Sequence, residues 1–253
     1  MDSRIHIYGR RVFRALFLFV VVPYITLCGT LYFFQEELIF FPEKLDKNYV
    51  FNFGQNAEEI YTLSTDEKSL HGLLLSVPKP RGLIFYLHGN AGSVNTWGEV
   101  AKTYTDLQYD VYIHDYRGYG KSEGEITSQD QLFDDHQRVY EALKKRYSEE
   151  SIVIIGYSLG TGFAAKLASV NNPKLLILQA PYYSLIDMMQ QTYAFVPTFL
   201  LKYSLITHQY LESVRAPLVI FHGNCDEVVP YSSSLKLKSE FKLTDTLITL
   251  PGQ

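Results

Sequence analysis

The chain alternates short, uninterrupted apolar runs with stretches of helical periodicity. Runs of this kind are too apolar for strands with one solvent-facing side, so each is expected to be a strand buried on both faces. Strands that alternate with helices form a parallel sheet with helices on both faces, and an α/β fold is therefore predicted. The apolar runs fall within 82–89, 110–116, 151–160, 174–181 and 217–230, and the helical stretches fall near 96–107, from 128, and up to about 170. Ser128 and Gln131 have the spacing of a capping box at the start of the second helix.

Two further features describe the ends of this pattern. The stretch 58–78 reads as two strands joined by a charged turn, which predicts an antiparallel entry to the sheet. Near the other end, a helix from Tyr231 to about Phe241 leads to a closing strand, Thr246 to Leu250. The 253 residues are ordinary for one large domain, which we place at 35–253.

One segment, about 182–211, interrupts the alternation of strands and helices. It is apolar and aromatic, and its pattern indicates an insertion of short helices. A lid that faces the substrate and an addition to the core both agree with this composition.

The N-terminal region predicts a membrane anchor. Residues 15–34 carry no charge, and a helix of that length crosses a hydrocarbon core of about 30 Å. The segment 1–14 before it contains four arginines, and Glu36 and Glu37 follow it. This asymmetry places the N-terminus in the cytoplasm and the domain on the other side, as a single-pass protein. A cleaved signal peptide and a buried core helix remain the alternatives.

The charge and the cysteines exclude several classes of function. A net charge of −4, with no basic cluster outside the N-terminal segment, argues against nucleic acid as a partner. Cys28 and Cys225 are the two cysteines, and neither belongs to a zinc-ligand pattern. We therefore predict neither a metal nor an organic cofactor.

The sequence GYSLG, residues 156–160, matches the pattern of a nucleophilic serine on a sharp turn between a strand and a helix. Such a turn needs tiny neighbours, which Gly156 and Gly160 provide. It places the backbone N–H of Leu159 and the positive end of the helix beside the serine oxygen. Ser158 is therefore the candidate nucleophile, and Leu159 is the first candidate oxyanion donor.

The second oxyanion donor is expected in the loop LHGNAGS, residues 87–93, which follows an earlier strand. We expect the backbone N–H of Asn90 to be this donor. His88 and Gly89 would hold the shape of the loop. His88 as the catalytic base is a disfavoured alternative, because it precedes the serine in the wrong part of the sheet.

The acid of the site is expected in the loop after a later strand, where it can reach the back of a histidine ring. Asp226 occupies that position, shortly before Val228, Val229 and Pro230. Glu227 and Asp187 are weaker rivals, and His222 is expected to be structural.

Four ordered motifs carry a family resemblance: LHGNAGS, DYRGYGKSEGE, GYSLGTGFAA and FHGNCDEVVP. Together they resemble the α/β-hydrolase superfamily. With QEELIFFP after the apolar span, they are similar to its small membrane-anchored members, whose domain is of the serine-aminopeptidase or dienelactone-hydrolase type. The resemblance covers roughly residues 35–252 and implies a serine hydrolase with Ser158 as nucleophile and Asp226 as acid. It implies no catalytic role for Asp115 to Ser122.

One departure from this family is large. Its members place a histidine after the acid, followed by a helix, but none of the seven histidines here follows Asp226. We therefore expect the sequence to be truncated just after the last strand, before the histidine loop and the last helix. A chain without the base would retain little activity, because the loss of a general base costs about a million-fold in a comparable protease.

The expected function is hydrolysis of an ester or thioester, with a small-molecule or lipid-like substrate. A tethered protein that keeps the fold and binds without turnover is the first alternative, and the missing histidine is its support. A serine peptidase is the second, since it would use the same residues.

Overall fold

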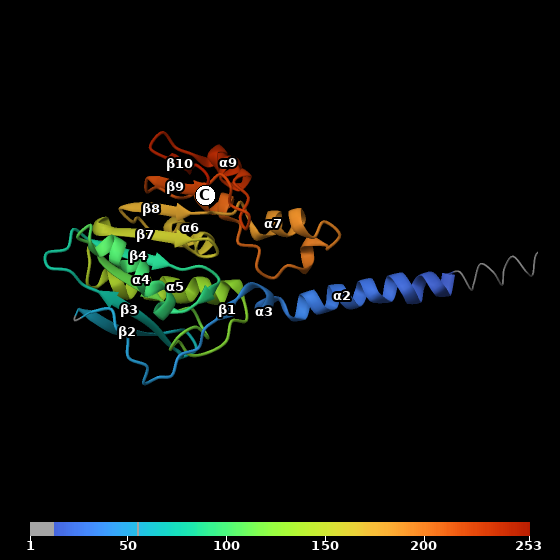
Figure 1. The fold of residues 1–253 in the computed structure, drawn as a ribbon, viewed down its shortest axis with the longest axis horizontal. Coiled ribbons are helices and arrows are strands. Elements are labelled where there is room, and N and C mark those ends of the chain that lie inside the picture. The colour runs from blue at the N-terminus through green and yellow to red at the C-terminus, as the bar shows by residue number, and fades with distance from the viewer. Residues whose placement is uncertain (1–12, 55) are drawn as a thin grey trace, which may run out of the picture.

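The computed structural model describes residues 13–54 and 56–253 (Figure 1). Most of the basic segment 1–14, including Arg4, Arg10, Arg11 and His6, lies outside the described residues. Predictions that rest on those side chains therefore remain predictions.

An eight-stranded sheet forms the centre of the domain, in the order β10-β9-β8-β7-β4-β6-β3-β2. The strands from β6 to β10 are parallel, whereas β2 and β3 pair antiparallel with each other and β3 pairs antiparallel with β6. This topology confirms the predicted α/β fold and its antiparallel entry. The strands are β2 (Ala57–Leu63), β3 (Ser69–Leu75), β4 (Leu83–Leu87), β6 (Asp110–His114), β7 (Ile152–Tyr157), β8 (Leu175–Gln179), β9 (Leu218–Gly223) and β10 (Thr246–Leu250).

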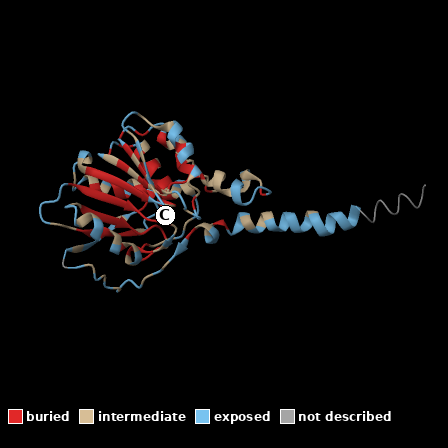
Figure 2. Ribbon diagram, turned by 45° about the horizontal axis from the view of Figure 1, so that its top comes forward, coloured by how far each residue is buried: buried red, intermediate tan, exposed pale blue. Residues whose placement is uncertain are grey.

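Helices cover both faces of the sheet, and the strands send alternate side chains to each face. In β4, Phe85 packs with α5 (Gln129–Lys144) and α6 (Gly160–Ser169), whereas Tyr86 packs on the side of α4 (Val94–Thr105). Figure 2 shows the buried strands between these layers. The continuous apolar runs in the sequence therefore reflect burial on two faces.

The N-terminal apolar segment is helical and extends away from the domain (Figures 1 and 2). It contains η1 (Phe17–Val21) and α2 (Val22–Phe33), and α3 (Gln35–Ile39) follows. Among the described residues, Phe13–Phe33 is one helix long and apolar enough to cross a membrane, and none of its apolar window is buried. This exposure argues against the core-helix alternative. Length and composition agree equally with an anchor and a signal sequence.

The interruption between β8 and β9 consists of short helices, as expected. It contains α7 (Leu185–Thr192), η3 (Thr198–Leu200) and α8 (Thr207–Leu211). In Figure 1, α7 lies beyond the carboxyl ends of the strands, on the side from which α2 leaves the domain. This insertion therefore stands over the sheet edge at which parallel α/β proteins bind ligands.

The remaining elements show three local differences from the expectations. A two-residue pair, β1 (Phe41–Pro42) with β5 (Ala91–Gly92), was not predicted. The helix expected from Tyr231 to about Phe241 is shorter, because α9 (Ser232–Leu237) is followed by the 3₁₀ turn η4 (Lys238–Glu240). A further 3₁₀ turn, η2 (Glu149–Ser151), precedes β7. At the start of α5, Ser128 accepts the expected bond from Gln131 N–H, but the Gln131 side chain accepts from Thr127 N–H instead of closing a capping box.

Candidate active site

Ser158 lies on the turn between β7 and α6, and its backbone has a φ of 47°. A residue with a side chain rarely adopts this left-handed conformation, and it costs of order 1–3 kcal/mol. The turn is held because Ser158 N–H donates to Gln179 O at 2.9 Å, while Thr161 N–H and Oγ1 both donate to Ser158 O. The side chain of Ser158 remains partly exposed, so a substrate can reach it.

The turn requires glycine at positions 156 and 160, because neighbouring backbone atoms leave no room for a Cβ. A Cβ on Gly156 would lie 2.6 Å from Gly160 O, and a Cβ on Gly160 would lie 2.1 Å from Leu87 O. The second contact joins the turn directly to the end of β4. The serine turn and the loop after β4 are therefore packed together without space for a side chain between them.

Two backbone N–H groups near this contact have no hydrogen-bond partner among the described residues. They belong to Leu159, which precedes α6, and to Asn90 in the loop after β4. Unpaired donors beside a nucleophile can stabilise the negative charge that develops on an acyl oxygen. The residues singled out as oxyanion donors therefore remain available for that role.

The loop that carries Asn90 is fixed from behind by tyrosine hydroxyls and a backbone N–H. Tyr116 Oη donates to His88 O at 2.6 Å. Asn90 O accepts from Tyr119 Oη at 2.7 Å and from Phe41 N–H at 2.8 Å. The role of these tyrosines could not be predicted from the sequence, because their contacts depend on pairing across the sheet.

Asp226 lies in the loop after β9, at the same carboxyl edge. Its Oδ1 accepts from Val228 N–H at 2.8 Å and from Val229 N–H at 2.9 Å. Its Oδ2 lies 3.6 Å from Nε2 of the buried His222. No hydrogen bond joins Asp226 to Ser158 within the described chain, so a proton acceptor would have to stand between them.

The described histidines are engaged elsewhere. His222 contacts Ser234 Oγ and Val229 O, in agreement with a structural role. His88 contacts Gly89 O and stacks on Tyr116 with ring centroids 4.0 Å apart, and burial lowers its pKa. None of the six described histidines forms a hydrogen bond with Ser158; they are His71, His88, His114, His136, His208 and His222.

The weaker rival Asp187 is placed away from this loop. It lies in the first turn of α7, where it pairs with Lys236 at 2.6 Å. Glu227 is exposed and directly follows Asp226.

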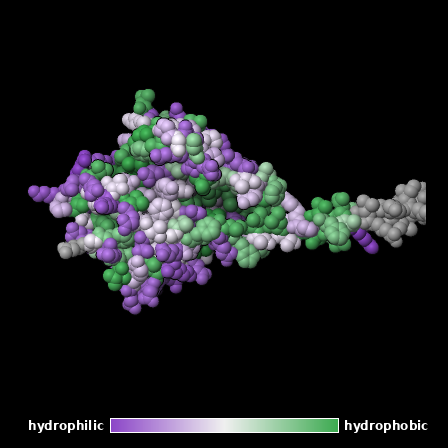
Figure 3. All heavy atoms as spheres, in the orientation of Figure 1, coloured by the Kyte–Doolittle hydropathy of each residue, from purple (hydrophilic) through white to green (hydrophobic). Residues whose placement is uncertain are grey.

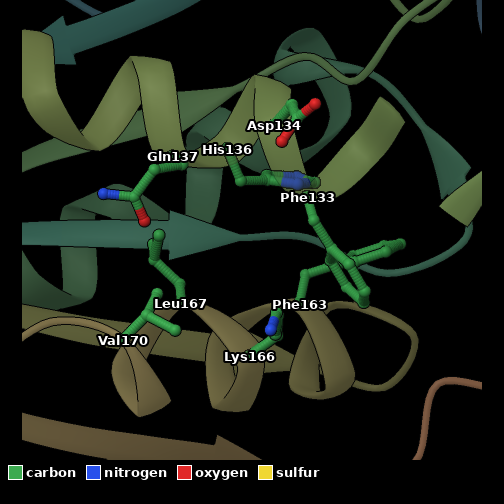
Figure 4. A pocket seen from close by; sticks show the side chains of 8 residues that line it. All are labelled: Phe133, Asp134, His136, Gln137, Phe163, Lys166, Leu167 and Val170. Atoms are coloured by element: carbon green, nitrogen blue, oxygen red, sulfur yellow. The ribbon is translucent and has the colours of Figure 1, made fainter. Parts of the chain in front are cut away.

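A cavity of about 370 Å³ between α5 and α6 is shown in Figure 4. Phe133 and Phe163 form part of its wall, and Lys166 lies at its edge. Neither Ser158 nor Asp226 lines it, so it is separate from the candidate site. Within the described residues, no group of three His, Cys, Asp or Glu side chains could hold a metal ion.

Known proteins resemble this chain in sequence over most of its length. Residues 78–206 match the family described as serine aminopeptidase, S33. Protein bem46 of Schizosaccharomyces pombe is 28% identical over 80% of this chain and 73% of its own length. The lysophosphatidylserine lipase ABHD12 of Macaca fascicularis is 27% identical over 90% of this chain and 68% of its own length.

Solved structures support the same fold. An esterase of Pyrococcus furiosus, Pf2001, superposes with a TM-score of 0.66 at 20% identity and covers 84% of this chain and 87% of its own. The fold, with a serine on the turn after a central strand, defines an α/β-hydrolase. Within that class, the chain belongs to the serine aminopeptidase S33 family.

Proposed function

We propose that this hydrolase uses Ser158 to cleave an ester or thioester, and that its N-terminal helix anchors it to a membrane. The observation that carries the proposal is the strained Ser158 backbone beside two unpaired N–H groups. Strain of this kind persists where the surrounding structure holds a residue in a reactive position.

In the proposed reaction, Ser158 Oγ attacks the acyl carbonyl and gives its proton to a general base. The oxygen becomes negative and is stabilised by the N–H groups of Leu159 and Asn90. The bond to the leaving alcohol or thiol then breaks, and the leaving group takes the proton. Water, activated by the same base, releases the acid and restores the serine.

The general base is proposed to be a histidine that Asp226 orients. The support is geometric: Cys225 N–H donates to Gln253 O at 2.7 Å, and Gly252 N–H donates to Asn224 Oδ1 at 2.8 Å. The residues after β10 therefore run beside the loop that carries Asp226. A histidine beside this loop would lie next to the carboxylate that is proposed to orient it.

The apolar helix and the apolar insertion favour membrane attachment and an acyl substrate together. The exposed apolar helix has the length of a bilayer span, and the insertion over the sheet edge is apolar. The lipase named among the relatives acts on a lipid, which favours a lipid or acyl ester for this chain. The proposed orientation places the N-terminus in the cytoplasm and the hydrolase domain on the other side.

A fluorophosphonate probe tests the nucleophile, since an activated serine displaces its fluoride and keeps the phosphonate. Full-length protein should be labelled and Ser158→Ala should not, while Ser184→Ala, which changes a buried helix cap, serves as the control. Equal labelling of wild type and Ser158→Ala would remove the assignment.

The binding-protein alternative keeps one observation in its favour, since no described histidine forms a hydrogen bond with Ser158. Full-length protein that folds but resists the probe would support it. A peptidase would be labelled as well, and comparison of acyl esters with aminoacyl amides would separate the two activities.

A further inference from the structure

A cavity of about 410 Å³ lies between the N-terminal helix and the insertion over the sheet edge. Leu27 and Leu31 of α2 form one wall, and Met188, Met189 and Val196 form the opposite wall. Its volume lies in the range of small-ligand sites, which runs from about 300 to 1,000 Å³. Figure 3 shows hydrophobic side chains gathered where the helix meets the domain.

The cavity has no charged side chain in its lining. Its buried polar residue is Gln35, whose Nε2 donates to Leu200 O at 2.6 Å and whose Oε1 accepts from Lys202 N–H at 2.8 Å. Both ends of this amide are thus satisfied by the protein. A ligand in the cavity would find few polar partners, so the cavity suits an apolar chain.

The two walls are tied to each other. Tyr24 Oη donates to Phe195 O at 2.9 Å, and Glu36 accepts from Tyr203 Oη at 2.9 Å. The cavity is therefore a built junction between the helix and the insertion. Its α2 wall is part of the apolar helix Phe13–Phe33, whose apolar window has no buried residue and whose surface a hydrocarbon environment would cover.

The wall of the cavity is linked to the turn of the candidate nucleophile through the chain and two hydrogen bonds. Ser158 N–H donates to Gln179 O at the end of β8, and the chain then continues through Tyr182 into α7. Tyr182 Oη donates to Leu159 O at 3.0 Å. The start of α7, at Leu185, lies in the cavity wall and packs on the core beneath the site.

From these contacts we infer that the cavity between α2 and α7 binds one acyl chain of a membrane lipid, which enters from the bilayer along the helix. A membrane lipid would then be the substrate class of the proposed hydrolase, and the kinetic test below rests on that proposed function. Binding of the chain itself does not depend on turnover.

The test is photolabelling of full-length protein in phosphatidylcholine vesicles that contain a phosphatidylcholine with a diazirine in its acyl chain. Wild type should be labelled at Met188, Met189 or Val196. Met189→Trp fills the cavity and should lower this labelling several-fold. Gln190→Trp adds the same ring to an exposed neighbour outside the lining and should leave it unchanged.

A kinetic comparison complements the labelling. With p-nitrophenyl palmitate, Met189→Trp should raise KM at least fourfold, the effect of about one lost methylene contact. KM for p-nitrophenyl acetate should stay the same, because its acyl group has no chain that could fill the cavity. If Met189→Trp does not fold, Leu31→Trp fills the cavity from the other wall.

Equal labelling of Met189→Trp and wild type, or labels restricted to residues 13–26 of the apolar helix, would overturn the inference. If labelling follows the expectation but neither ester is hydrolysed, the result would support the acyl-chain cavity and count against the proposed hydrolase. If both esters are hydrolysed and Met189→Trp leaves KM for the palmitate unchanged, the result would support the hydrolase and overturn the assignment of the cavity as an acyl-chain site.

Discussion

The hydroxyl of Tyr119 donates a hydrogen bond of 2.7 Å to the carbonyl oxygen of Asn90, 29 residues earlier in the chain. This bond fixes the peptide group next to the N–H that is proposed to stabilise the oxyanion. A positioning role follows, because Tyr119 is buried behind the loop and does not face the substrate.

Tyr119→Phe is expected to lower kcat by between about twofold and tenfold, the range for one lost hydrogen bond, with little change in KM. Ester hydrolysis by full-length protein provides the measurement. Tyr147→Phe is the matched control, because it removes a 2.7 Å bond to Asp110 at the opposite end of β6. A similar loss of kcat in both variants would mean a general effect on stability.

Phe41 provides the second bond to Asn90 O, from its backbone N–H. Phe41→Pro removes this donor, and the extended backbone of Phe40, with a ψ of 125°, accepts a following proline. We expect kcat to fall by between about twofold and tenfold. Phe41→Ala keeps the N–H and removes a half-exposed ring, so it should retain kcat; equal losses would assign the effect to the ring.

Asp226→Asn should reduce kcat strongly while the loop keeps its shape. The amide oxygen of asparagine can still accept from Val228 N–H and Val229 N–H, but the charge that would stabilise a protonated histidine is lost. The comparable change in a serine protease costs about 10⁴ in kcat. Glu227→Gln makes the same change on the exposed neighbour, and a larger loss there would reverse the assignment.

Acid should destabilise the fold through its buried histidines. Burial lowers the pKa of His136 to about 3 and also lowers those of His88 and His114. The unfolded chain takes up protons below its histidine pKa of about 6.5, whereas the folded chain does not. The free energy of unfolding should therefore fall below pH 6.5, by about 1.4 kcal/mol per pH unit down to about pH 3 from His136, and His88 and His114 should add to the fall in the same direction.

His136→Phe should make this decline shallower, since it removes one of the three groups and keeps an aromatic ring against Phe163. Urea unfolding between pH 4 and 7 gives the slope. Val139→Ala, in the same helix, controls for a loss of stability without a titrating group. Identical slopes for both variants would show that His136 does not resist protonation.

Local patterns in the sequence were sufficient to predict the parallel sheet, the antiparallel entry and the serine turn. The continuous apolar runs of β4 and β7 indicated burial on two faces, and Gly156 and Gly160 marked the turn around Ser158. These features depend on the period of side chains along one element and on steric demands within a few residues, so they can be read without the fold.

The contacts behind the oxyanion loop could not be predicted in this way. Phe41 and Tyr119 meet Asn90 because β1 pairs with β5 and because β6 lies beside β4, and no local pattern encodes either pairing. The burial of His136 likewise depends on the packing of α5 against α6.

The sequence by itself therefore determined the class of fold and the identity of the candidate nucleophile and acid. The tertiary structure decided which groups hold the oxyanion loop and where an apolar cavity forms between Leu31 and Met189. The physical reason is that a strand or helix follows from interactions between near neighbours, whereas a site and a cavity follow from packing between segments far apart in the chain.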